Sequence, residues 1–377
     1  MFANKDIHSF DDARRLARKY LPWMVFDYID GSAGEEAGEK RGREAIRNTL
    51  LQSRILVNVS KRDISVDVFD HSAKCPFGIS PMGMCNLARP GTDLMLARLA
   101  AKYQVPHGVS TVSSTSLEKI IETAEGHAWF QLYISGDGST ASYLVERAQA
   151  SGYRTLVLTL DVPEVGLRPR ELRRGFKMPF RIGLSQFVDF ALHPTWSIPS
   201  LIHGAPDMAN FTEPGHSFDR TESRAAADWD KLAQLRDAWK GNLVVKGVLS
   251  VDDALRLKKE GVDAIQVSSH GGRQLDSAVP PVNALSQIRQ AVGDEYPLFY
   301  DTGLRSGEDI VKAYALGADF VFMGRPMLFA SAAGGERGLS QYWKLLMDET
   351  SLTLAQIGKD SMKGLETTIA PDNFSVL

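Results

Sequence analysis

The chain has 377 residues, a length that suits either two ordinary domains or one large α/β barrel with extensions. With 44% hydrophobic and 24% charged residues it has the composition of a soluble globular protein, and its formal net charge of −3 argues against a nucleic-acid partner. Its two cysteines, Cys75 and Cys85, have no metal-type spacing, which argues against a disulfide framework or a zinc site.

The N-terminal stretch is charged throughout and contains no apolar segment. Because no run of about 18 apolar residues occurs in the chain, we expect neither a signal peptide nor a membrane-spanning helix. These features predict a cytoplasmic protein. Residues 1–76 are expected to form an N-terminal helical extension, with one helix near residues 10–20 and another near 22–31.

Short apolar runs rich in β-forming residues alternate with amphipathic helical segments from residue 77 onward. The predicted strands are 76–81, 107–112, 128–134, 155–161, 243–248, 264–269, 297–302 and 320–325. The predicted helices between them include 93–103, 141–151, 251–261, 282–292 and 307–317. This alternation predicts an α/β fold, a (β/α)8 TIM barrel over 77–335 rather than an open sheet. Helices over 336–377 would complete a single domain, 1–377.

One connection is far longer than the others. About 80 residues separate the fourth predicted strand, which ends near Asp161, from the fifth, which starts near Leu243. We expect a long loop over 176–225. Its stretch 178–204 combines Phe, Trp, Leu and Ile with flanking basic residues. This stretch either packs on the barrel or a neighbouring subunit, or lies on a membrane surface without spanning it.

Polar residues follow the predicted strands at the end where a barrel of this class carries its active site. In VSSHGGRQLD (267–276), Gly271 and Gly272 leave room for His270 and Arg273 to converge on one small anion. The other residues of this kind are Gln131, Tyr133, Thr159, Asp161, Arg168, Lys246, Ser268, Asp301, Gly303, Arg305, Gly324 and Arg325. Glycine and arginine after the last two strands predict a phosphate site and therefore a phosphorylated cofactor.

Several segments, in this order, resemble the FMN-dependent L-2-hydroxy acid oxidase and dehydrogenase family over nearly the whole chain. They are VFDYIDGSAGEE (25–36), FQLY (130–133), LTLDVP (158–163), VVKG (244–247), SHGGRQLD (269–276) and GRP (324–326). The resemblance implies FMN as cofactor, oxidation of a small L-2-hydroxy acid to the 2-oxo acid, and a homo-oligomer, commonly a tetramer.

The resemblance also assigns catalytic roles. It implies that His270 accepts the substrate hydroxyl proton, because a neutral imidazole titrates near neutral pH. Asp161 would orient that ring and stabilise the imidazolium. Lys246 would lie near the flavin N1 and O2 edge and stabilise the reduced, anionic ring. Tyr133 would hydrogen-bond near the reacting hydroxyl.

Substrate contacts are implied for two arginines and several smaller residues. Arg273 and Arg168 would clamp the substrate carboxylate with their planar guanidinium groups, assisted by Tyr28. We expect most of the arginines close to Arg168 in the sequence, which are Arg170, Arg173 and Arg174, to be solvated. The modest size of Gly83, Val112 and Val165 leaves room for lactate or a larger, even aromatic, 2-hydroxy acid.

Cofactor contacts form the third implied group. The residues expected at the isoalloxazine ring and ribityl chain are Pro81, Met82, Gly83, Ser110, Gln131, Thr159, Lys246 and Ser268. Those expected at the ribityl phosphate end are Asp301, Gly303, Arg305, Gly324 and Arg325. Thr302 departs from the family pattern, in which Gly or Ser stands at this position. No metal site is expected.

The remaining alternatives within this family differ in the electron acceptor that reoxidises the flavin. The segment ALHPTW (191–196) most resembles the lactate and mandelate dehydrogenases, whose corresponding segment associates with membrane and passes electrons to quinone. That likeness favours a dehydrogenase, peripheral on the inner face of the cytoplasmic membrane, over an oxygen-using oxidase. An FMN-dependent isomerase is less favoured, because no second Gly/Arg phosphate loop is evident. Loss of the α-hydrogen as a hydride or as a proton would use the same residues.

Overall fold

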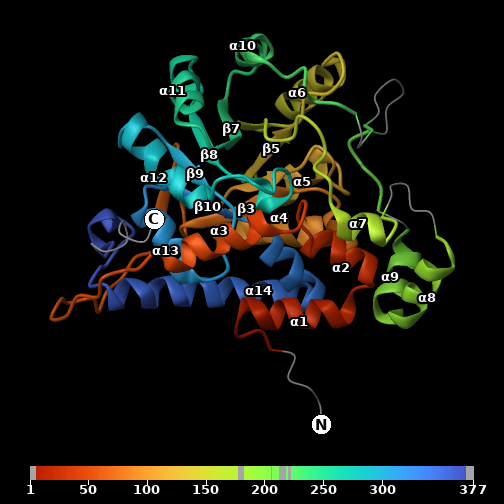
Figure 1. Cartoon of the computed structure of the whole chain (residues 1–377), viewed down its shortest axis with the longest axis horizontal. Helices are drawn as coiled ribbons and strands as arrows, with labels where there is room; N and C mark the ends of the chain where they lie inside the picture. The colour runs from red at the N-terminus through yellow and green to blue at the C-terminus, as the bar shows by residue number, and fades with distance from the viewer. Residues whose placement is uncertain (1–5, 177–181, 205, 212–217, 220–221, 371–377) are drawn as a thin grey trace.

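The structure, a computed structural model, describes residues 6–176, 182–204, 206–211, 218–219 and 222–370. Its centre is a closed barrel of parallel strands, as the sequence predicts (Figure 1). The strands in barrel order are β3 (Phe77–Met82), β4 (His107–Val109), β5 (Ala128–Leu132), β6 (Thr155–Thr159), β7 (Asn242–Val248), β8 (Ala264–Val267), β9 (Leu298–Tyr300) and β10 (Phe320–Met323). The barrel closes through the pairing of β10 with β3.

Both faces of the barrel strands are buried, which explains their nearly continuous runs of Val, Leu, Ile and Phe. The helices that follow the strands are α4 (Thr92–Tyr103), α5 (Leu117–Thr123), α6 (Ser139–Ala150), α10 (Trp229–Ala238), α11 (Val251–Lys259), α12 (Pro281–Val292), α13 (Gly307–Ala315) and α14 (Arg325–Gln356). The alternation of apolar runs and amphipathic segments therefore predicted the barrel correctly. Gly335, at φ 60° and ψ −139°, interrupts α14.

A β-hairpin closes the amino-terminal end of the barrel. Its strands are β1 (Val66–Val68) and β2 (His71–Ala73), paired antiparallel. Phe69, at the turn, packs against Trp129 and Phe299, with ring centroids 5.6 and 5.5 Å apart. Because these aromatic rings fill one end of the barrel, a ligand enters at the other end, where the strands have their carboxyl ends.

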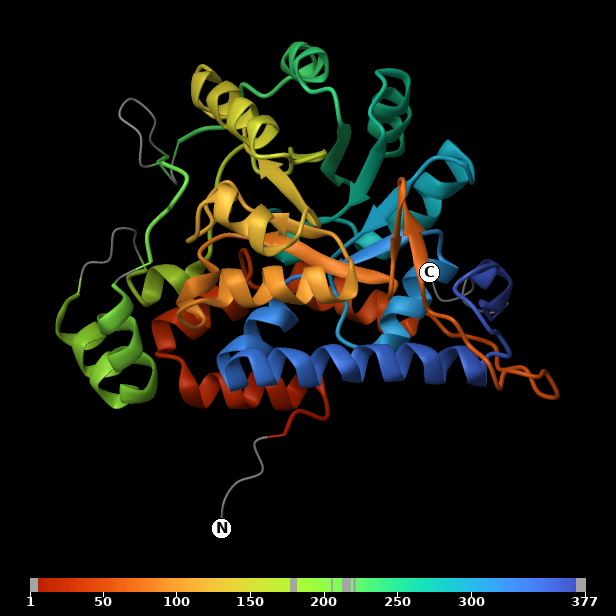
Figure 2. The same ribbon diagram turned by 180° about the vertical axis from the view of Figure 1, so that it is seen from behind.

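The N-terminal extension contains α1 (Phe10–Tyr20), α2 (Trp23–Asp30) and α3 (Ala37–Asn48), and the two helices expected near 10–20 and 22–31 are present. Helix α1 lies along α14 (Figures 1 and 2). Helix α3 packs against α12 and α13 and against the 3-10 turn η2 (His270–Gly272). The extension thus covers the segment that carries His270.

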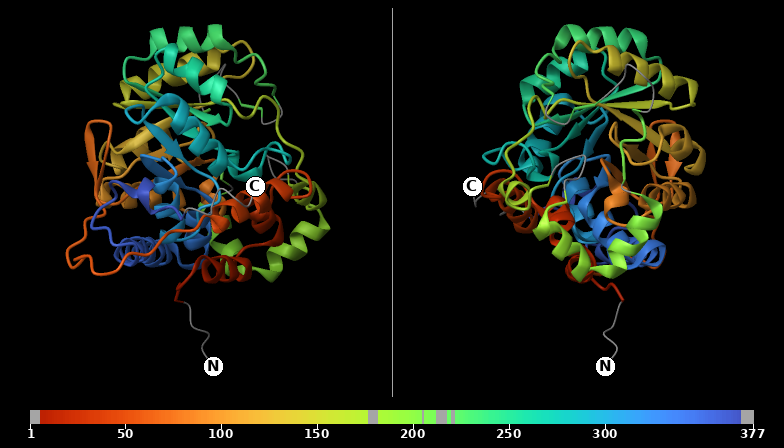
Figure 3. Two further views of the ribbon diagram at one scale, coloured as in Figure 1. Left: turned by 60° about the vertical axis from the view of Figure 1, so that its left-hand side comes forward. Right: turned by 90° about the vertical axis from the view of Figure 1, so that its right-hand side faces the viewer.

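The long connection after β6 is largely helical where the structure describes it. It contains α7 (Pro169–Arg173), α8 (Leu184–Leu192) and α9 (Pro194–His203). The α8–α9 pair lies beside the N-terminal helices at the edge of the molecule (Figure 3). The carboxylate of Asp189 accepts hydrogen bonds from the amides of Trp23 and Met24, and Trp196 Nε1 donates to the carbonyl of Leu87.

Parts of the sequence predictions fall outside the described residues. These parts are 1–5 of the extension 1–76, 178–181 within the stretch 178–204, further positions of the loop 176–225, and 371–377 at the end of the helices expected over 336–377. After α14, the described chain continues to the 3-10 turn η3 (Leu365–Thr368). No helix among the described residues is long and apolar enough to cross a bilayer.

Asp276, the last residue of the HGGRQLD stretch, caps helix α3. Its carboxylate accepts hydrogen bonds from the amide of Gly38 at 2.7 Å and from the amide of Glu35 at 2.9 Å. The N-cap residue itself, Glu36, makes no side-chain capping bond. Asp276 therefore supplies, from a distant loop, the acceptor that the first turn of α3 lacks.

We expect Asp276→Ala to lower the free energy of unfolding by about 1 kcal/mol, because two amides at the start of α3 lose their acceptor. Asp276→Asn keeps one acceptor oxygen and should lose less. The midpoint of urea unfolding measures both changes, with the exposed neighbour Ser277→Ala as control. An unchanged midpoint in Asp276→Ala would contradict the capping role.

Candidate active site

A cavity of about 820 Å³ opens at the carboxyl ends of the barrel strands. Its walls come from the strand ends, from α2 and from the long connection after β6. The expected site residues in these walls are Tyr28, Pro81, Met82, Gly83, Ser110, Val112, Tyr133, Val165, Arg168, Lys246, His270, Arg273, Asp301, Gly303, Arg305, Gly324 and Arg325. Of the other expected residues, Gln131, Thr159 and Ser268 are buried and Asp161 is partly buried in contact with His270 of the wall.

His270 and Asp161 form a hydrogen-bonded pair, with Nδ1 and Oδ1 2.9 Å apart. Since an ionised carboxylate only accepts hydrogen bonds, this contact places a proton on Nδ1 and leaves Nε2 as the basic nitrogen. Gly247 packs against Asp161 so closely that a Cβ there would lie 2.5 Å from the Asp161 Cβ. The glycine of VVKG is therefore needed for this packing.

Burial lowers the pKa of His270, although the charge of Asp161 opposes this shift. Burial also acts to raise the pKa of Asp161, but His270 and Lys246 outweigh that effect and the net pKa lies below its ordinary value. At neutral pH the pair therefore holds a neutral imidazole beside an ionised carboxylate. This is the protonation state that a general base requires.

Lys246, which also lines the cavity, is largely buried and belongs to a second cluster of polar side chains. Its Nζ lies 2.8 Å from Ser268 Oγ and 3.2 Å from Asp301 Oδ2. Asp301 also accepts hydrogen bonds from Ser268, from Gln266 Nε2 at 2.8 Å and from Thr302. Asp301, which was expected at the phosphate end, instead contacts Lys246, where its charge stabilises the buried ammonium.

Two further arginines of the cavity wall surround one carboxylate, that of Glu39. Arg305 Nη2 lies 3.2 Å and Arg325 Nη1 3.7 Å from Glu39 Oε1. Burial, together with repulsion from Arg305, lowers the pKa of Arg325 to about 10. Two guanidinium groups and one carboxylate leave one net positive charge beside the backbone of Gly303 and Gly324. Such an arrangement suits a phosphate group.

A second arginine pair shares Glu171. Arg273 Nη2 lies 2.7 Å and Arg168 Nη1 3.4 Å from its Oε1, and the three side chains are largely buried. Arg273 also donates to the carbonyls of Tyr28 and Gly31 at 2.7 and 2.8 Å. The two arginines predicted to bind the substrate carboxylate therefore lie together, joined by an acidic residue that was not predicted. Glu171 follows Arg168 by three residues, and this spacing was the one sequence feature that could have indicated their contact.

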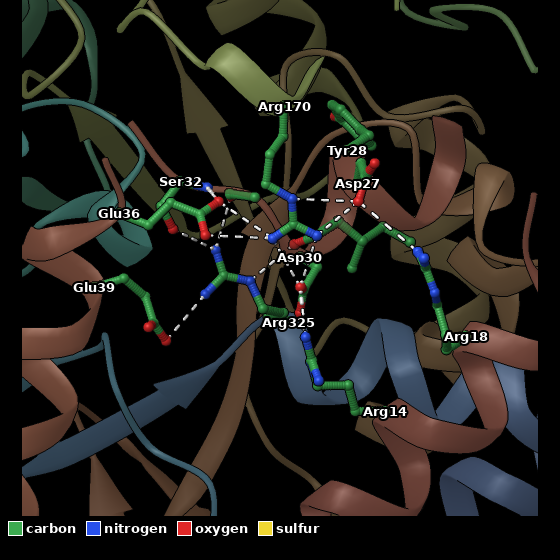
Figure 4. A network of polar contacts seen from close by, with 12 residues as sticks. Arg14, Arg18, Asp27, Tyr28, Asp30, Ser32, Glu36, Glu39, Arg170 and Arg325 are labelled. Carbon is green, nitrogen blue, oxygen red and sulfur yellow. Dashed lines mark hydrogen bonds and ion pairs between the residues drawn. The ribbon is translucent and has the colours of Figure 1, made fainter. Parts of the chain in front are cut away.

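Most of the neighbouring arginines are solvated, as expected: Arg173 and Arg174 are exposed. Arg170 is only partly exposed, and its guanidinium pairs with Asp27 at 2.6 Å, Asp30 at 2.9 Å and Glu36 at 3.2 Å (Figure 4). Arg174 also contacts Asp27, at 2.7 Å. These pairs tie α7 to α2, because burying the two carboxylates of α2 requires cationic partners.

Tyr28 and Tyr133 face the cavity from different elements. The ring of Tyr28 stacks on Phe176 with centroids 4.4 Å apart, and its hydroxyl lies 3.5 Å from the carbonyl of Gly83. Burial raises the pKa of Tyr133, so its phenol stays protonated and can donate a hydrogen bond. Arg224 lies over the Tyr133 ring at 5.0 Å.

The long connection contributes wall residues that the sequence analysis did not name. They are Phe176, Pro206, Asp207, Met208, Phe218, Asp219 and Arg224. No short motif marks them, since their positions depend on how the whole connection folds back over the barrel.

Two buried polar atoms near the strand ends show which kind of ligand the cavity could hold. Gln131 Nε2 and Thr159 Oγ1 have no hydrogen-bond partner among the described residues. A buried polar group without a partner costs about 1–3 kcal/mol, so these atoms favour a ligand with polar edges. Together with Lys246 and the Arg305–Arg325 pair, they fit a flat heterocycle that carries a phosphate. The residues present therefore fit FMN.

Comparison with known proteins agrees with this geometry. Residues 17–371 match the family model described as FMN-dependent dehydrogenase. The (S)-mandelate dehydrogenase of Pseudomonas putida is 38% identical over 376 residues, which cover 98% of this chain and 94% of that protein. An L-lactate dehydrogenase of Allorhizobium ampelinum is 34% identical and covers 98% of both chains.

Solved structures give the same result. The crystal structure of the monotopic membrane protein (S)-mandelate dehydrogenase superposes with a TM-score of 0.90 at 38% identity, covering 95% of this chain and 97% of that one. A mandelate oxidase superposes with a TM-score of 0.83 at 34% identity, with the same coverage. The chain therefore belongs to the FMN-dependent dehydrogenase family and is an oxidoreductase that uses FMN.

Proposed function

We propose that this enzyme oxidises an L-2-hydroxy acid with an apolar side chain, of the mandelate or lactate type, to the 2-oxo acid. The observation that carries the proposal is one cavity that holds both the His270–Asp161 pair and the Arg168–Arg273 pair. A 2-hydroxy acid presents a hydroxyl proton for the first pair and a carboxylate for the second. The net positive charge around Glu171 matches that carboxylate.

The residues divide the chemistry as follows. His270 Nε2 takes the proton of the substrate hydroxyl, and Asp161 stabilises the imidazolium that results. Arg168 and Arg273 fix the substrate carboxylate, and this orients the α-carbon. When bound, FMN would supply the oxidant that takes up the α-hydrogen and the two electrons. Tyr133, whose phenol is protonated, donates a hydrogen bond to the reacting oxygen.

Holding FMN is the task of the remaining polar residues. We assign the ring to Ser110, Gln131, Thr159 and Lys246, and the phosphate to Arg305, Arg325 and the backbone of Gly303 and Gly324. The buried ammonium of Lys246 favours a cofactor that gains negative charge on reduction.

The substrate side chain would face an apolar part of the cavity. Val112, Val165, Phe176 and Met208 contribute its walls. A Cβ at Gly83 would lie 2.5 Å from Val112 Cγ2, so Val112 can occupy this part of the wall only because residue 83 is glycine. These walls favour an aromatic or branched side chain over the single hydrogen of glycolate, although apolar pockets separate similar acids only weakly.

The α8–α9 hairpin supports a membrane-linked acceptor. Its exposed apolar side chains are Leu184, Phe187, Val188, Leu192, Ile198, Leu201 and Ile202, with Ile182 just before it. Exposed apolar side chains gathered on one helical hairpin fit the headgroup region of a bilayer. Together with the monotopic relative, it supports quinone as the acceptor and a place on the inner face of the cytoplasmic membrane. The structural likeness to a mandelate oxidase keeps oxygen as the second candidate acceptor.

An exposed loop supports self-association. Ile55, Leu56 and Val57 are 83%, 100% and 49% exposed, on a loop that projects from the body of the molecule (Figure 2, orange). Apolar side chains that stand this far out favour burial in a subunit interface. We infer that a second copy of the chain covers them, within a homo-oligomer of the tetrameric type common among relatives.

Anaerobic mixing with candidate acids tests the reaction class. We expect L-mandelate to bleach the visible flavin band fastest, L-lactate more slowly and glycolate least, because the cavity walls favour larger side chains. The spectrum of the purified holoenzyme is the measurement. If none of these acids bleached the flavin, the enzyme would not be a 2-hydroxy acid dehydrogenase, and an isomerase would become the better reading.

His270→Gln should keep the bound flavin but reduce its bleaching rate by at least about 100-fold, because the base is lost. In the native enzyme, kcat/KM should fall as the pH drops through the pKa of His270, which burial keeps below its ordinary 6.5. The sign follows because the protonated ring cannot accept a proton. His127→Gln, on a histidine outside the cavity, is the control; equal rates in both variants would remove His270 from the base role.

Combined replacement of Leu184, Phe187 and Leu201 by Ser should abolish cosedimentation with vesicles of phosphatidylethanolamine and phosphatidylglycerol. These side chains are 82%, 64% and 81% exposed, so their loss leaves the fold intact. Anaerobic flavin bleaching by L-mandelate should stay at the native rate. Leu352→Ser, at a 58% exposed leucine of α14, is the matched control. Undiminished vesicle binding in the triple variant would exclude the hairpin as the docking surface.

A further inference from the structure

We propose that Thr302 is a positioning residue whose hydroxyl holds the turn that carries His270 in its working conformation. The inference rests on the proposed role of His270 as base. Thr302 Oγ1 accepts hydrogen bonds from the amides of Ser269 at 3.3 Å and Gly271 at 3.2 Å. The same hydroxyl donates to Asp301 Oδ1 at 2.9 Å.

The turn needs such support because its backbone is unusual. His270, Gly271 and Gly272 have φ values of 57°, 66° and 75°, three consecutive residues in the left-handed region. Glycine adopts this region readily, but a histidine does so at a conformational cost. His270 therefore stays in this conformation only if its surroundings hold it there.

Two side-chain hydroxyls accept hydrogen bonds from three consecutive amides at this turn, those of residues 269–271. Thr302 takes those of Ser269 and Gly271, and Ser268 Oγ takes that of His270 at 3.0 Å. Ser268 in turn contacts Lys246 Nζ at 2.8 Å. His270 and the buried Lys246 therefore belong to one hydrogen-bonded network. Thr302 accepts from the two amides on either side of His270.

Thr302 is itself strained. Its φ of 88° is in a region that β-branched residues rarely adopt. Its carbonyl accepts a hydrogen bond from the Tyr300 hydroxyl at 2.8 Å, which helps to hold this backbone. A glycine would relieve the strain but would lack the hydroxyl. The three hydrogen bonds that the Thr302 hydroxyl makes thus offset the conformational cost of its backbone.

Loosening this turn should change the environment of His270. The groups that act on its charge are Asp161, 2.9 Å away, and Lys246 and Arg168. Burial is the main cause that keeps its pKa low. If the turn became mobile and the ring more solvated, the pKa would rise toward its ordinary value, and the Nε2 position would spread over several geometries.

Three substitutions separate the hydroxyl from the backbone. Thr302→Val removes the hydroxyl at nearly constant shape, Thr302→Ser restores it, and Thr302→Gly removes it while relieving the strain. In the FMN-loaded enzyme we expect peptides over 269–273 to exchange deuterium faster in Thr302→Val and Thr302→Gly than in the native protein. Thr302→Ser should keep native protection.

Kinetics supply the second readout. The anaerobic rate of flavin bleaching, corrected for flavin content, should fall about 10- to 100-fold in Thr302→Val, because a base misplaced by a fraction of an ångström transfers protons slowly. The acid limb of its kcat/KM profile should move to higher pH, while KM changes less than kcat. Thr302→Ser should recover most of the rate.

The outcomes are distinguishable. Native exchange in Thr302→Val, or equal rates and pH profiles in Thr302→Val and Thr302→Ser, would overturn the inference. If Thr302→Val did not fold, the unstrained Thr302→Gly would decide by the same exchange measurement. If no 2-hydroxy acid bleached even the native enzyme, the proposed function would fail, whereas faster exchange confined to the variants that lack the hydroxyl would still show that Thr302 holds the turn.

Discussion

Closure of the parallel barrel is the constraint on which the rest of the structure depends. Because all its strands run in one direction, their carboxyl ends meet at one rim, and Phe69 with its aromatic neighbours fills the other end. Residues as distant in sequence as Tyr28 and Arg273 thereby meet at one cavity. Charge balance then shapes the site: Glu171 and Glu39 each lie between two arginines, and each group keeps one positive charge that suits an anion.

Much of this architecture could be predicted from the sequence. The fully buried strands appear as unbroken apolar runs, and the helices between them have apolar residues at helical spacing, so the barrel follows from periodicity alone. The polar residues at the strand ends were found for the same reason, since a barrel has a single functional rim. The contact between His270 and Asp161 joins two of these strand ends, but their pairing was predicted from the family resemblance.

Other features depend on contacts between distant segments and left no local pattern. Asp276 belongs to the most distinctive motif, yet its partners are amides of α3, more than two hundred residues earlier. Arg170 looks like a surface arginine in sequence, but two buried carboxylates of α2 need its charge. Thr302 was visible only as a departure from the family pattern. Its function as an acceptor for two amides required the left-handed turn to be seen.

The central claim is that this cavity breaks the α-carbon–hydrogen bond of a 2-hydroxy acid while His270 accepts a proton. The most direct measurement is single-turnover flavin bleaching at saturating L-mandelate, compared with the same acid deuterated at the α-carbon. The account predicts clearly slower bleaching with the deuterated acid. Bleaching by acids that lack an α-hydrogen, or no bleaching by either isotopic form, would contradict it.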